Sequence, residues 1–371
     1  MTPKFKRNQF YKFLSFIVFI SLFTGSCKED YIPIKMNQIQ LIGSHNSYKL
    51  RIQKELWQQI YSRDSLMAMT LDYGHASLSD QLNMGIRGLE LDVYHDPMGG
   101  RYAAPYGNKI LSEMGVAPLT YDPEGKMNIP GLKVFHVQEI DFRSHFYLFK
   151  EGLEQLKQWS LSNPDHMPII VTINAKDGML DIPDFVQPLA FNASALDSID
   201  GEIRSIFDES HLITPDLVRG ESKSLKEAVF SKGWPSVDRS KGKIMFVLDE
   251  FGKKRKLYIK DHPSLKKRVM FIPVAAGSPE SAFFIINDPV KSQNKIRELV
   301  KKGYMVRTRA DADTWEARKA DYKRWNMAMQ SGAQLISTDY YKPDTSLTSY
   351  HVKFKEREEY RLNPLFALQA D

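Results

Sequence analysis

Short runs of apolar, β-branched-rich residues recur along the chain, and stretches with the spacing of an amphipathic helix lie between several of them. The expected strands are Ile39–Ile42, Ile86–Val93, Leu132–Val137, Pro168–Ile173, Lys243–Leu248, Ala282–Ile286, Tyr304–Val306 and Gln334–Ile336, with Val269–Val274 as a spare. The expected helices include Leu148–Leu161, Val290–Lys302 and Ala317–Gln330. Strands that alternate with helices predict a parallel sheet, and about eight of them predict an α/β fold, a single (β/α)8 barrel of the TIM type, regular or distorted.

Two observations narrow this architecture. A doubly wound sheet is the alternative, but no Gly-x-Gly-x-x-Gly follows the first strand. No linker rich in Pro, Gly or Ser divides the chain, so we expect one barrel domain over residues 39–371.

The expected helix Ala317–Gln330 also carries end signals, with Asp313 as N-cap, Glu316 three residues later and Gly332 near the end.

The first 26 residues have the pattern of an export signal. Four cations and no acid accompany the run Phe13–Phe23, whose apolar character is broken only by Ser15 and Ser21. This run is too short to cross a bilayer, which takes about 20 residues, but it fits the apolar core of a secretory signal. We therefore expect residues 1–26 to be removed on export.

Cys27 is the single cysteine, and it follows Thr24-Gly25-Ser26, which resembles a bacterial lipobox. The resemblance implies a lipoprotein signal peptide over 1–26, a diacylated Cys27 and a lipidated tether over 27–38. It predicts an exported lipoprotein of the cell envelope, held in the outer membrane, and Lys28-Glu29-Asp30 resembles a signal for export to the cell surface. The alternative is an ordinary cleaved signal with an incidental cysteine.

The charge of the chain argues against nucleic acid as a partner. The 51 Lys and Arg exceed the 45 Asp and Glu, which gives a net charge of +6. Four of the cations lie in the expected signal, so the rest of the chain is close to neutral. The large basic surface that nucleic-acid binding requires is therefore not expected.

Charged, amide or imidazole side chains follow most of the expected strands at their C-terminal ends. They are His45 and Asn46, Glu90 and Asp92, His136, Asn174 and Lys176, Asp249 and Glu250, Arg307 and Arg309, and Asp339. In a barrel, the C-terminal ends of the strands form one rim, and this rim carries the active site. Such a concentration of functional groups therefore predicts an active site there.

The residues differ in how strongly they point to function. Glu90 and Asp92 lie two positions apart in an apolar strand, and buried carboxylates are costly unless they are paired or bind a metal. For the others a purely structural role is an open alternative. His45 could be a hydrogen-bonded structural histidine and His136 a core histidine. Arg307 and Arg309 could form surface ion pairs, and Asp339 could be a turn or cap residue.

Together the side chains suit the cleavage of a phosphodiester. Carboxylate and amide oxygens are ligands for a hard cation such as Ca²⁺ or Mg²⁺. Arginine and lysine bind phosphate, and two histidines can supply a general base and a general acid. No Gly-x-Ser-x-Gly occurs, so a serine hydrolase is not indicated.

Several blocks also resemble a known family. Gly43-Ser44-His45-Asn46-Ser47-Tyr48 and Arg87-Gly88-Leu89-Glu90-Leu91-Asp92-Val93 resemble the catalytic blocks of phosphatidylinositol-specific phospholipases C. Further blocks resemble the bacterial calcium-dependent branch: Val134–Val137, Ile140–Ser144, Trp159–Pro168, Val306–Thr314 and Ser331–Asp339. The resemblance covers residues from about Ile39 to Tyr341 and implies a barrel of the PLC-like phosphodiesterase kind.

The resemblance implies a role for each rim residue. His45 would be the general base or acid on the attacking inositol hydroxyl, His136 would stabilise or protonate the phosphoryl oxygens, and Asp339 would orient His45. The implied metal ligands are Asn46, Glu90, Asp92 and Asn174, with Ca²⁺ as cofactor and Mg²⁺ as the alternative. Lys176, Arg307 and Arg309 would hold phosphate or inositol hydroxyls.

Asn174 departs from the family pattern, which often has an acid at this place. A neutral oxygen there leaves a ligand set with two negative charges instead of three, so we expect weaker Ca²⁺ binding.

The function expected from the sequence is cleavage of phosphatidylinositol-type lipids to diacylglycerol and a cyclic or open inositol phosphate. We expect a monomer that reaches its lipid substrate from a membrane-anchored N-terminus. One alternative is a glycerophosphodiester phosphodiesterase, although its early His-Arg-Gly is replaced here by His45-Asn46-Ser47. A second alternative is a non-catalytic surface lipoprotein that binds glycans or lipid head groups on the same barrel.

Overall fold

The computed structural model describes residues 33–355 and 359–366 of the 371-residue chain. Eight parallel strands form its centre, hydrogen-bonded in the order β6-β5-β4-β2-β1-β9-β8-β7. They are β1 Ile39–Ser44, β2 Gly88–Tyr94, β4 Ile169–Ala175, β5 Ile244–Leu248, β6 Met270–Phe271, β7 Phe283–Ile285, β8 Met305–Arg309 and β9 Leu335–Thr338. The end strands β6 and β7 are not paired, which leaves one open seam in a nearly closed barrel. The structure thus confirms the predicted (β/α)8 barrel in its distorted form.

One expected strand was assigned wrongly. The run Leu132–Val137 forms only β3, Lys133–Val134, which pairs antiparallel with β2 and lies outside the barrel order. The spare run Val269–Val274 supplies the missing barrel strand as β6, which pairs parallel with β5. A further short strand, β10 Tyr360–Leu362, pairs antiparallel with β1.

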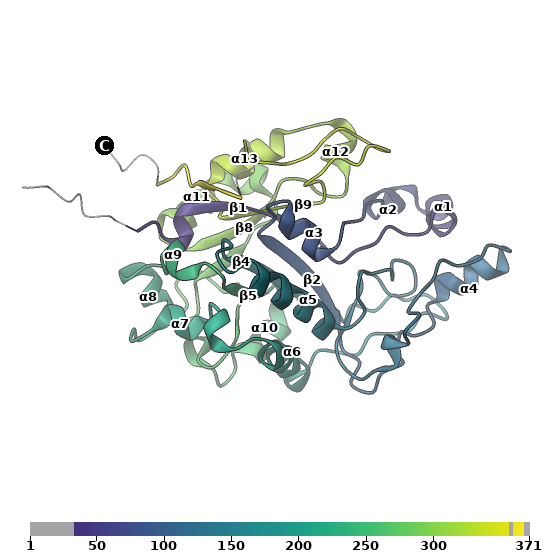
Figure 1. Ribbon diagram of the computed structural model, residues 1–371, viewed down its shortest axis with the longest axis horizontal. Coiled ribbons are helices and arrows are strands. Elements are labelled where there is room, and N and C mark those ends of the chain that lie inside the picture. The colour runs from purple at the N-terminus through teal and green to yellow at the C-terminus, as the bar shows by residue number, and fades with distance from the viewer. Residues whose placement is uncertain (1–32, 356–358, 367–371) are drawn as a thin grey trace, which may run out of the picture. The chain divides into compact units, whose positions relative to one another are not determined.

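Helices surround the strands, and Figure 1 shows α5, α6 and α10 on one side and α11 and α13 on the other. The α-helices are α1 Lys54–Arg63, α2 Ser65–Thr70, α3 Leu78–Asn83, α4 Tyr106–Glu113, α5 Phe149–Ser162, α6 Ala193–Ile206, α7 Pro215–Arg219, α8 Leu225–Ser231, α9 Val237–Ser240, α10 Gly252–Ile259, α11 Pro289–Lys301, α12 Trp315–Lys319 and α13 Lys323–Ser331. Short 3-10 helices are η1 Met36–Gln38, η2 Lys126–Asn128, η3 Glu209–His211 and η4 Pro263–Leu265. Within residues 33–355 and 359–366, no helix has both the length and the apolar character needed to cross a membrane.

The expected helices near 148–161 and 290–302 are α5 and α11, but the third expected helix is divided. Ala320 has a left-handed backbone, with φ of 49°, and it ends α12 before α13 begins. Asp313 is not the N-cap, because Thr314 holds that place without a side-chain cap, and Glu316 accepts a hydrogen bond from the Ala312 N–H instead. Gly332 ends α13 with φ of 79°, as the sequence predicts.

The folded part of the chain begins before Ile39. Met36, in η1, is buried, and its N–H donates to the carbonyl of Pro235 at 3.0 Å. Residues 35–38, expected to belong to a tether, therefore pack against the barrel. Cys27 and the expected signal lie outside the described residues.

Two glycines let strands β1 and β2 approach closely. Gly43 and Gly88 are direct partners across this pair, and a Cβ added to Gly88 would lie 2.3 Å from Leu335 Cδ1. The same Cβ would lie 2.9 Å from Gly43 Cα, so a side chain at Gly88 would force strands β1 and β2 apart. His45 and Asp339 follow β1 and β9, and Glu90 and Asp92 lie within β2, so this close packing fixes the distances among them.

Candidate active site

A histidine–aspartate pair forms where β1 and β9 end. His45 follows β1, Asp339 follows β9, and His45 Nδ1 lies 2.9 Å from Asp339 Oδ1. The strands pair Ser44 with Thr338, and the His45 N–H donates to the Thr338 carbonyl at 3.2 Å. Because an ionised carboxylate only accepts hydrogen bonds, Nδ1 carries a proton, and in the neutral imidazole this leaves the lone pair on Nε2. Nε2 is therefore the basic atom that can take a proton from a substrate.

Two charged groups lie beside this basic nitrogen. Arg309 Nη1 is 3.4 Å from His45 Nε2, and Glu90 Oε1 is 3.7 Å from it. Arg309 Nη2 also donates to Asp339 Oδ2 at 2.9 Å. Burial alone would raise the pKa of Asp339, but His45 and Arg309 hold it well below its usual range. The structure therefore brings the predicted catalytic pair together with one predicted phosphate-binding arginine.

The second predicted histidine is held by its own carboxylate. His136 lies in the loop after β3, and its Nδ1 is 2.7 Å from Asp141 Oδ2. Asp141 also lies 3.2 Å from the ammonium of Lys49, and both of these side chains are fully buried. Burial lowers the pKa of Lys49, and Asp141 opposes this effect. Asp141 thus fixes the orientation of His136 as Asp339 fixes that of His45.

Tyr73 lies between the two histidines. Its ring stacks against His45 with centroids 6.0 Å apart and meets the His136 ring edge-on at 6.5 Å. The Lys49 ammonium lies 4.5 Å from the centre of the Tyr73 ring and donates to the Tyr73 carbonyl at 2.7 Å. Two residues later, His75 Nε2 lies 2.7 Å from the His45 carbonyl oxygen. The segment from Tyr73 to His75 therefore braces both predicted catalytic histidines.

The carboxylate pair is surrounded by donors. Asn174 Nδ2 donates to Glu90 Oε1 at 2.9 Å and to Asp92 Oδ1 at 3.0 Å. Arg307 forms an ion pair with Glu90 Oε2, and the Lys176 ammonium lies 3.3 Å from Asp92 Oδ2. Burial opposes ionisation of Glu90, but Arg307 and His45 hold its pKa below the usual value. The coulombic effect of Asp92 raises the pKa of Lys176.

The surroundings of Arg307 do not suit a residue that binds a substrate phosphate. Its guanidinium is 1% exposed and donates to Ser337 Oγ at 3.0 Å and to Asn287 Oδ1 at 2.7 Å, in addition to Glu90. These contacts engage the guanidinium with protein groups. Arg309, whose side chain is 11% exposed beside His45, is better placed to reach a substrate phosphate.

Two buried oxygens near the pair could accept a hard cation. Asn46 has a left-handed backbone with φ of 49°, and its Nδ2 donates to the Tyr73 hydroxyl at 2.7 Å. Its Oδ1 is buried without a hydrogen-bond partner in the described chain, and Asp92 Oδ2, also buried, has the ion pair with Lys176 but no hydrogen bond that meets the geometric limits. Oxygen ligands of this kind suit Ca²⁺ or Mg²⁺. Asn174 instead turns its NH₂ group toward both carboxylates, and its oxygen would face them after a rotation of the amide.

No group of three or more His, Cys, Asp or Glu side chains in residues 33–355 and 359–366 is arranged to hold a metal ion. The predicted ligand set has only two carboxylates, Glu90 and Asp92. Its other two members are the side-chain amides of Asn46 and Asn174. The chemistry of the oxygens fits a hard cation, and Asn46, Glu90 and Asp92 are the residues that would hold it.

Sequence reasoning assigned no role to several residues of this site. Asp249 follows β5, one position beyond the pairing of Ile173 with Leu248, so it lies in the same row as Asn174. Burial and the nearby Glu90 raise the pKa of Asp249 to about 7, although Arg307 opposes the shift. Asp141 lies five residues after His136, in the block Ile140–Ser144, which the sequence singled out only by its resemblance to the family. No local pattern marked Tyr73 or His75, because only the fold brings them to the histidines.

The family model described as "Phosphoinositide phospholipase C, Ca2+-dependent" matches residues 34–364. The chain belongs to this family. The match includes every strand of the barrel and every residue of the site described above. This phospholipase C family member is therefore an enzyme of the phosphodiesterase class, and calcium dependence is a property of its family.

Solved structures of bacterial phospholipases C have the same fold as this chain. The calcium-dependent phosphoinositol-specific phospholipase C from a Pseudomonas species, in a myoinositol complex, is 15% identical with a TM-score of 0.53, over 89% of this chain and 96% of that one. The Ca²⁺-dependent phosphatidylinositol-specific phospholipase C from Streptomyces antibioticus is 18% identical with a TM-score of 0.50, over 85% and 98%. No curated protein sequence matches the chain.

Proposed function

We propose that this protein cleaves the phosphodiester of phosphatidylinositol-type lipids and releases diacylglycerol and a cyclic inositol phosphate. The observation that carries the proposal is the His45–Asp339 pair, in which Nδ1 faces the carboxylate and Nε2 lies 3.4 Å from Arg309. His45 as a base, with the Arg309 guanidinium held beside it, suits the deprotonation of a hydroxyl that attacks an adjacent phosphorus. The family and the solved relatives, which are phosphoinositol-specific and phosphatidylinositol-specific phospholipases C, point to the same substrate class.

The reaction needs no external nucleophile. His45 Nε2 takes the proton of the inositol 2-hydroxyl, whose oxygen forms a new bond to phosphorus. The bond from phosphorus to the glycerol oxygen breaks, and His136 supplies the proton that this oxygen needs. Arg309 offsets the charge on the phosphoryl oxygens, and Asp339 and Asp141 stabilise the protonated forms of the two histidines. Water can then open the cyclic ester, with the two histidines exchanging their roles as base and acid.

Asn46, Glu90 and Asp92 would hold the cation in this proposal. Ca²⁺ would supply positive charge where negative charge develops on phosphorus-bound oxygens. The buried Asn46 Oδ1, which has no hydrogen-bond partner in the described residues, and the buried Asp92 Oδ2, which faces only the Lys176 ammonium at 3.3 Å among the contacts described above, support this assignment. Asn174 would join them with its oxygen in place of its NH₂ group. Lys176 lies at the edge of the same cluster, where it can reach an inositol hydroxyl or a phosphate.

We further propose that the protein is a monomeric lipoprotein of the cell envelope. The lipobox-like sequence before Cys27 supports a lipid anchor at that residue. The anchor would keep the barrel close to a membrane that contains its substrate. Labelling of the expressed protein with a radioactive fatty acid, in the native chain and in Cys27→Ser, would test the anchor, because only the native chain should incorporate the label.

The first experiment follows the phosphorus products of phosphatidylinositol in mixed micelles with the full chain. We expect cyclic inositol phosphate in the presence of Ca²⁺ and little product with a chelator. Phosphorus NMR separates the cyclic ester from open phosphates. Cleavage of glycerophosphoinositol without cleavage of the lipid would identify a glycerophosphodiester phosphodiesterase instead. Inactivity on both substrates, together with headgroup binding, would indicate a non-catalytic barrel.

A further inference from the structure

A fully buried carboxylate is bonded to the backbone of the proposed catalytic pair. Asp311 comes two positions after the end of β8, and it is 0% exposed. Its Oδ1 accepts the backbone N–H of Asp339 at 2.8 Å, and its Oδ2 accepts a hydrogen bond from the Thr338 hydroxyl. The roles proposed above leave Asp311 without one.

The bond to Asp339 stands where the pairing of β8 with β9 ends. Arg309 is the last residue of β8, and it pairs with Ser337. The Asp339 N–H lies two positions beyond Ser337 and donates to the Asp311 carboxylate. A buried N–H without an acceptor is costly. The Asp311 side chain therefore does for Asp339 what a neighbouring strand does for residues within a sheet.

The second carboxylate oxygen restrains the residues on either side of Asp339. The Thr338 hydroxyl donates to Asp311 Oδ2 and accepts the Tyr340 N–H at 2.9 Å. The three consecutive residues from Thr338 to Tyr340 are thus bonded to a single carboxylate, directly or through one hydroxyl.

The backbone of Asp311 restrains the arginine of the site. Its carbonyl accepts a hydrogen bond from Arg309 Nε at 2.9 Å, and Arg309 Nη2 donates to Asp339 Oδ2, also at 2.9 Å. Arg309 Nη1 lies 3.4 Å from His45 Nε2. Asp311 therefore contacts both residues that flank the His45 imidazole, Arg309 through its carbonyl and Asp339 through its side chain.

The two buried carboxylates differ in their tendency to ionise. Burial and the neighbouring Asp339 raise the pKa of Asp311. Burial alone would also raise the pKa of Asp339, but His45 and Arg309 hold it well below its usual range. The charge is therefore favoured on the carboxylate that faces His45. Asp311 accepts from neutral donors, an amide and a hydroxyl, which suits a role in geometry.

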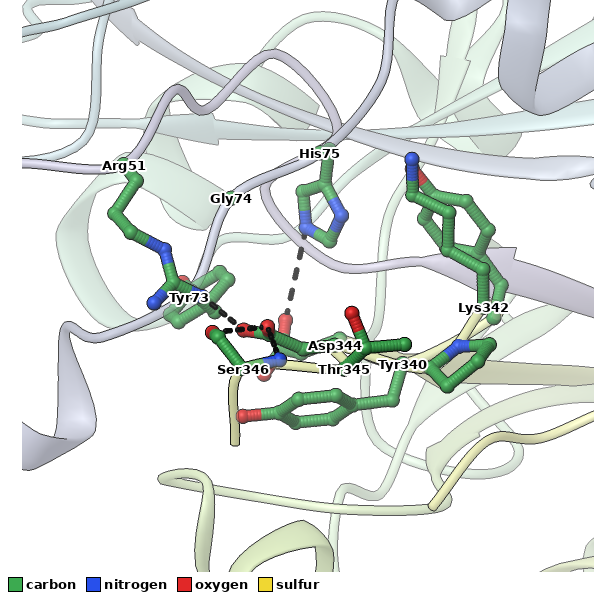
Figure 2. A pocket seen from close by; sticks show the side chains of 12 residues that line it. Arg51, Tyr73, Gly74, His75, Tyr340, Lys342, Asp344, Thr345 and Ser346 are labelled. Atoms are coloured by element: carbon green, nitrogen blue, oxygen red, sulfur yellow. Dashed lines mark hydrogen bonds and ion pairs between the residues drawn. The ribbon is translucent and has the colours of Figure 1, made fainter. Parts of the chain in front are cut away.

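Asp339 borders a cavity on another side. A pocket of about 340 Å³ lies between residues 339–346 and the segment from Tyr73 to His75. Figure 2 shows His75 and Tyr340 on opposite sides of it, and His75 Nε2 lies 3.9 Å from Asp339 Oδ1. A segment beside a cavity has fewer packing contacts than one inside the barrel, so the hydrogen bonds on its buried side matter more for its position.

We propose that Asp311 is a positioning residue of the reaction, which holds Asp339 in line with His45 Nδ1 and contacts no substrate atom. The proposal rests on the proposed phosphodiester cleavage, which it deepens by naming the group that keeps the base oriented. The imidazole acts as a base only while Asp339 fixes its tautomer and direction. A small displacement of Asp339 would therefore lower kcat and leave lipid binding largely unchanged.

The test measures kcat and KM on phosphatidylinositol for variants of the full chain. Asp311→Ala removes both acceptors, so kcat should fall about ten- to a hundredfold while KM stays within about twofold. Asp311→Asn keeps one acceptor oxygen and should recover most of this loss. The matched control is Asp200→Asn in α6, which changes a buried aspartate that bonds to the Tyr258 hydroxyl. It should lower the stability in urea and leave kcat unchanged.

A double-variant cycle tests whether the effect passes through Asp339. In Asp339→Asn the imidazole has already lost its fixed tautomer, so the further change Asp311→Ala should lower kcat by less than about threefold. Losses that multiply would overturn the proposal, because Asp311 would then act by another route. If Asp311→Ala does not fold, Thr338→Val decides. It should lower kcat severalfold by freeing the same carboxylate, and a native kcat in this variant would overturn the proposal.

A spectroscopic measurement separates this proposal from the proposed function. The hydrogen-bonded proton on His45 Nδ1 should give a low-field proton NMR signal, assigned by its loss in His45→Ala. Asp311→Ala should shift or broaden this signal, and Asp200→Asn should not. An unchanged signal and an unchanged kcat in Asp311→Ala would overturn the positioning role and leave the cleavage standing. Absence of all cleavage by the native chain would refute the proposed function, and the NMR signal would then decide by itself whether Asp311 positions the pair.

Discussion

His45 Nδ1 and Asp339 Oδ1 lie 2.9 Å apart although 294 positions of sequence separate the two residues. Strands β1 and β9 lie side by side in parallel, and each residue is the first to follow its strand. The pairing of Ser44 with Thr338 places the two side chains at the same level of the barrel rim. The geometry of the proposed base is therefore a direct result of strand register.

Removal of this base should abolish most turnover. His45→Ala loses the group that takes the hydroxyl proton, so we expect kcat on phosphatidylinositol to fall about 10²–10⁴-fold. Asp339→Asn keeps the imidazole but no longer favours the tautomer with a basic Nε2, and we expect a loss of about a hundredfold or more. Circular dichroism provides the folding control for both variants. A folded His45→Ala protein that keeps a tenth of the native kcat would contradict the assignment.

Asp141→Asn should reduce stability as well as activity. Asp141 neutralises Lys49 in a fully buried pair, and a buried charge left without its partner costs about 3–5 kcal/mol. We expect the free energy of unfolding, measured with urea, to fall by about that amount. The matched control is the double variant Lys49→Met/Asp141→Asn, which removes the buried charge and should recover part of the stability. Equal stability of the single variant and the native protein would show that the pair is not buried as described.

Tyr73→Phe should weaken cation binding while the ring packing persists. The Tyr73 hydroxyl accepts the Asn46 amide hydrogen at 2.7 Å and so leaves the Asn46 oxygen free for a cation. Loss of a group that orients a metal ligand typically costs ten- to a hundredfold in affinity. Titration of Ca²⁺ by calorimetry should show this shift, and Tyr61→Phe, on an exposed ring, should show none. Unchanged Ca²⁺ affinity in Tyr73→Phe would remove Asn46 from the ligand set.

The stability of the protein should depend on pH through His75. Burial lowers the pKa of His75 to about 4, although Asp339 opposes the shift, while in the unfolded chain the pKa is near 6.5. Between these values the unfolded state binds the proton, so stability is lost as the pH falls from about 6.5 toward 4. Between pH 7 and pH 5 this group should account for about 2 kcal/mol of the loss.

His75→Gln removes this titration and retains a donor for the His45 carbonyl. Urea unfolding at pH 7 and pH 5 should show a smaller fall in stability for the variant than for the native chain. His211→Gln is the control, because His211 is partly exposed and lies far from the site. An identical fall in His75→Gln and in the native protein would mean that His75 is not buried in its neutral form.

The alternation of strands and helices was sufficient to predict the barrel but not the membership of each strand. Leu132–Val137 and Val269–Val274 are similar apolar runs, and the sequence favoured the wrong one. Only the pairing of β6 with β5 in parallel, and of β3 with β2 in antiparallel direction, distinguishes them. Whether a short apolar run forms a strand, and with which partner, depends on the segments that pack beside it, and the local sequence pattern does not contain this information.

The sequence by itself determined which residues stand at the strand ends, because a strand end is a local property and parallel strands share one rim. It did not determine which of these side chains contact each other. The ion pair of Arg307 with Glu90, the bracing of both histidines by Tyr73 and the turn of the Asn174 amide toward two carboxylates all join segments far apart in the chain. Such contacts depend on register, burial and the exclusion of water from the rim. These are properties of the closed barrel, and only the tertiary structure decided them.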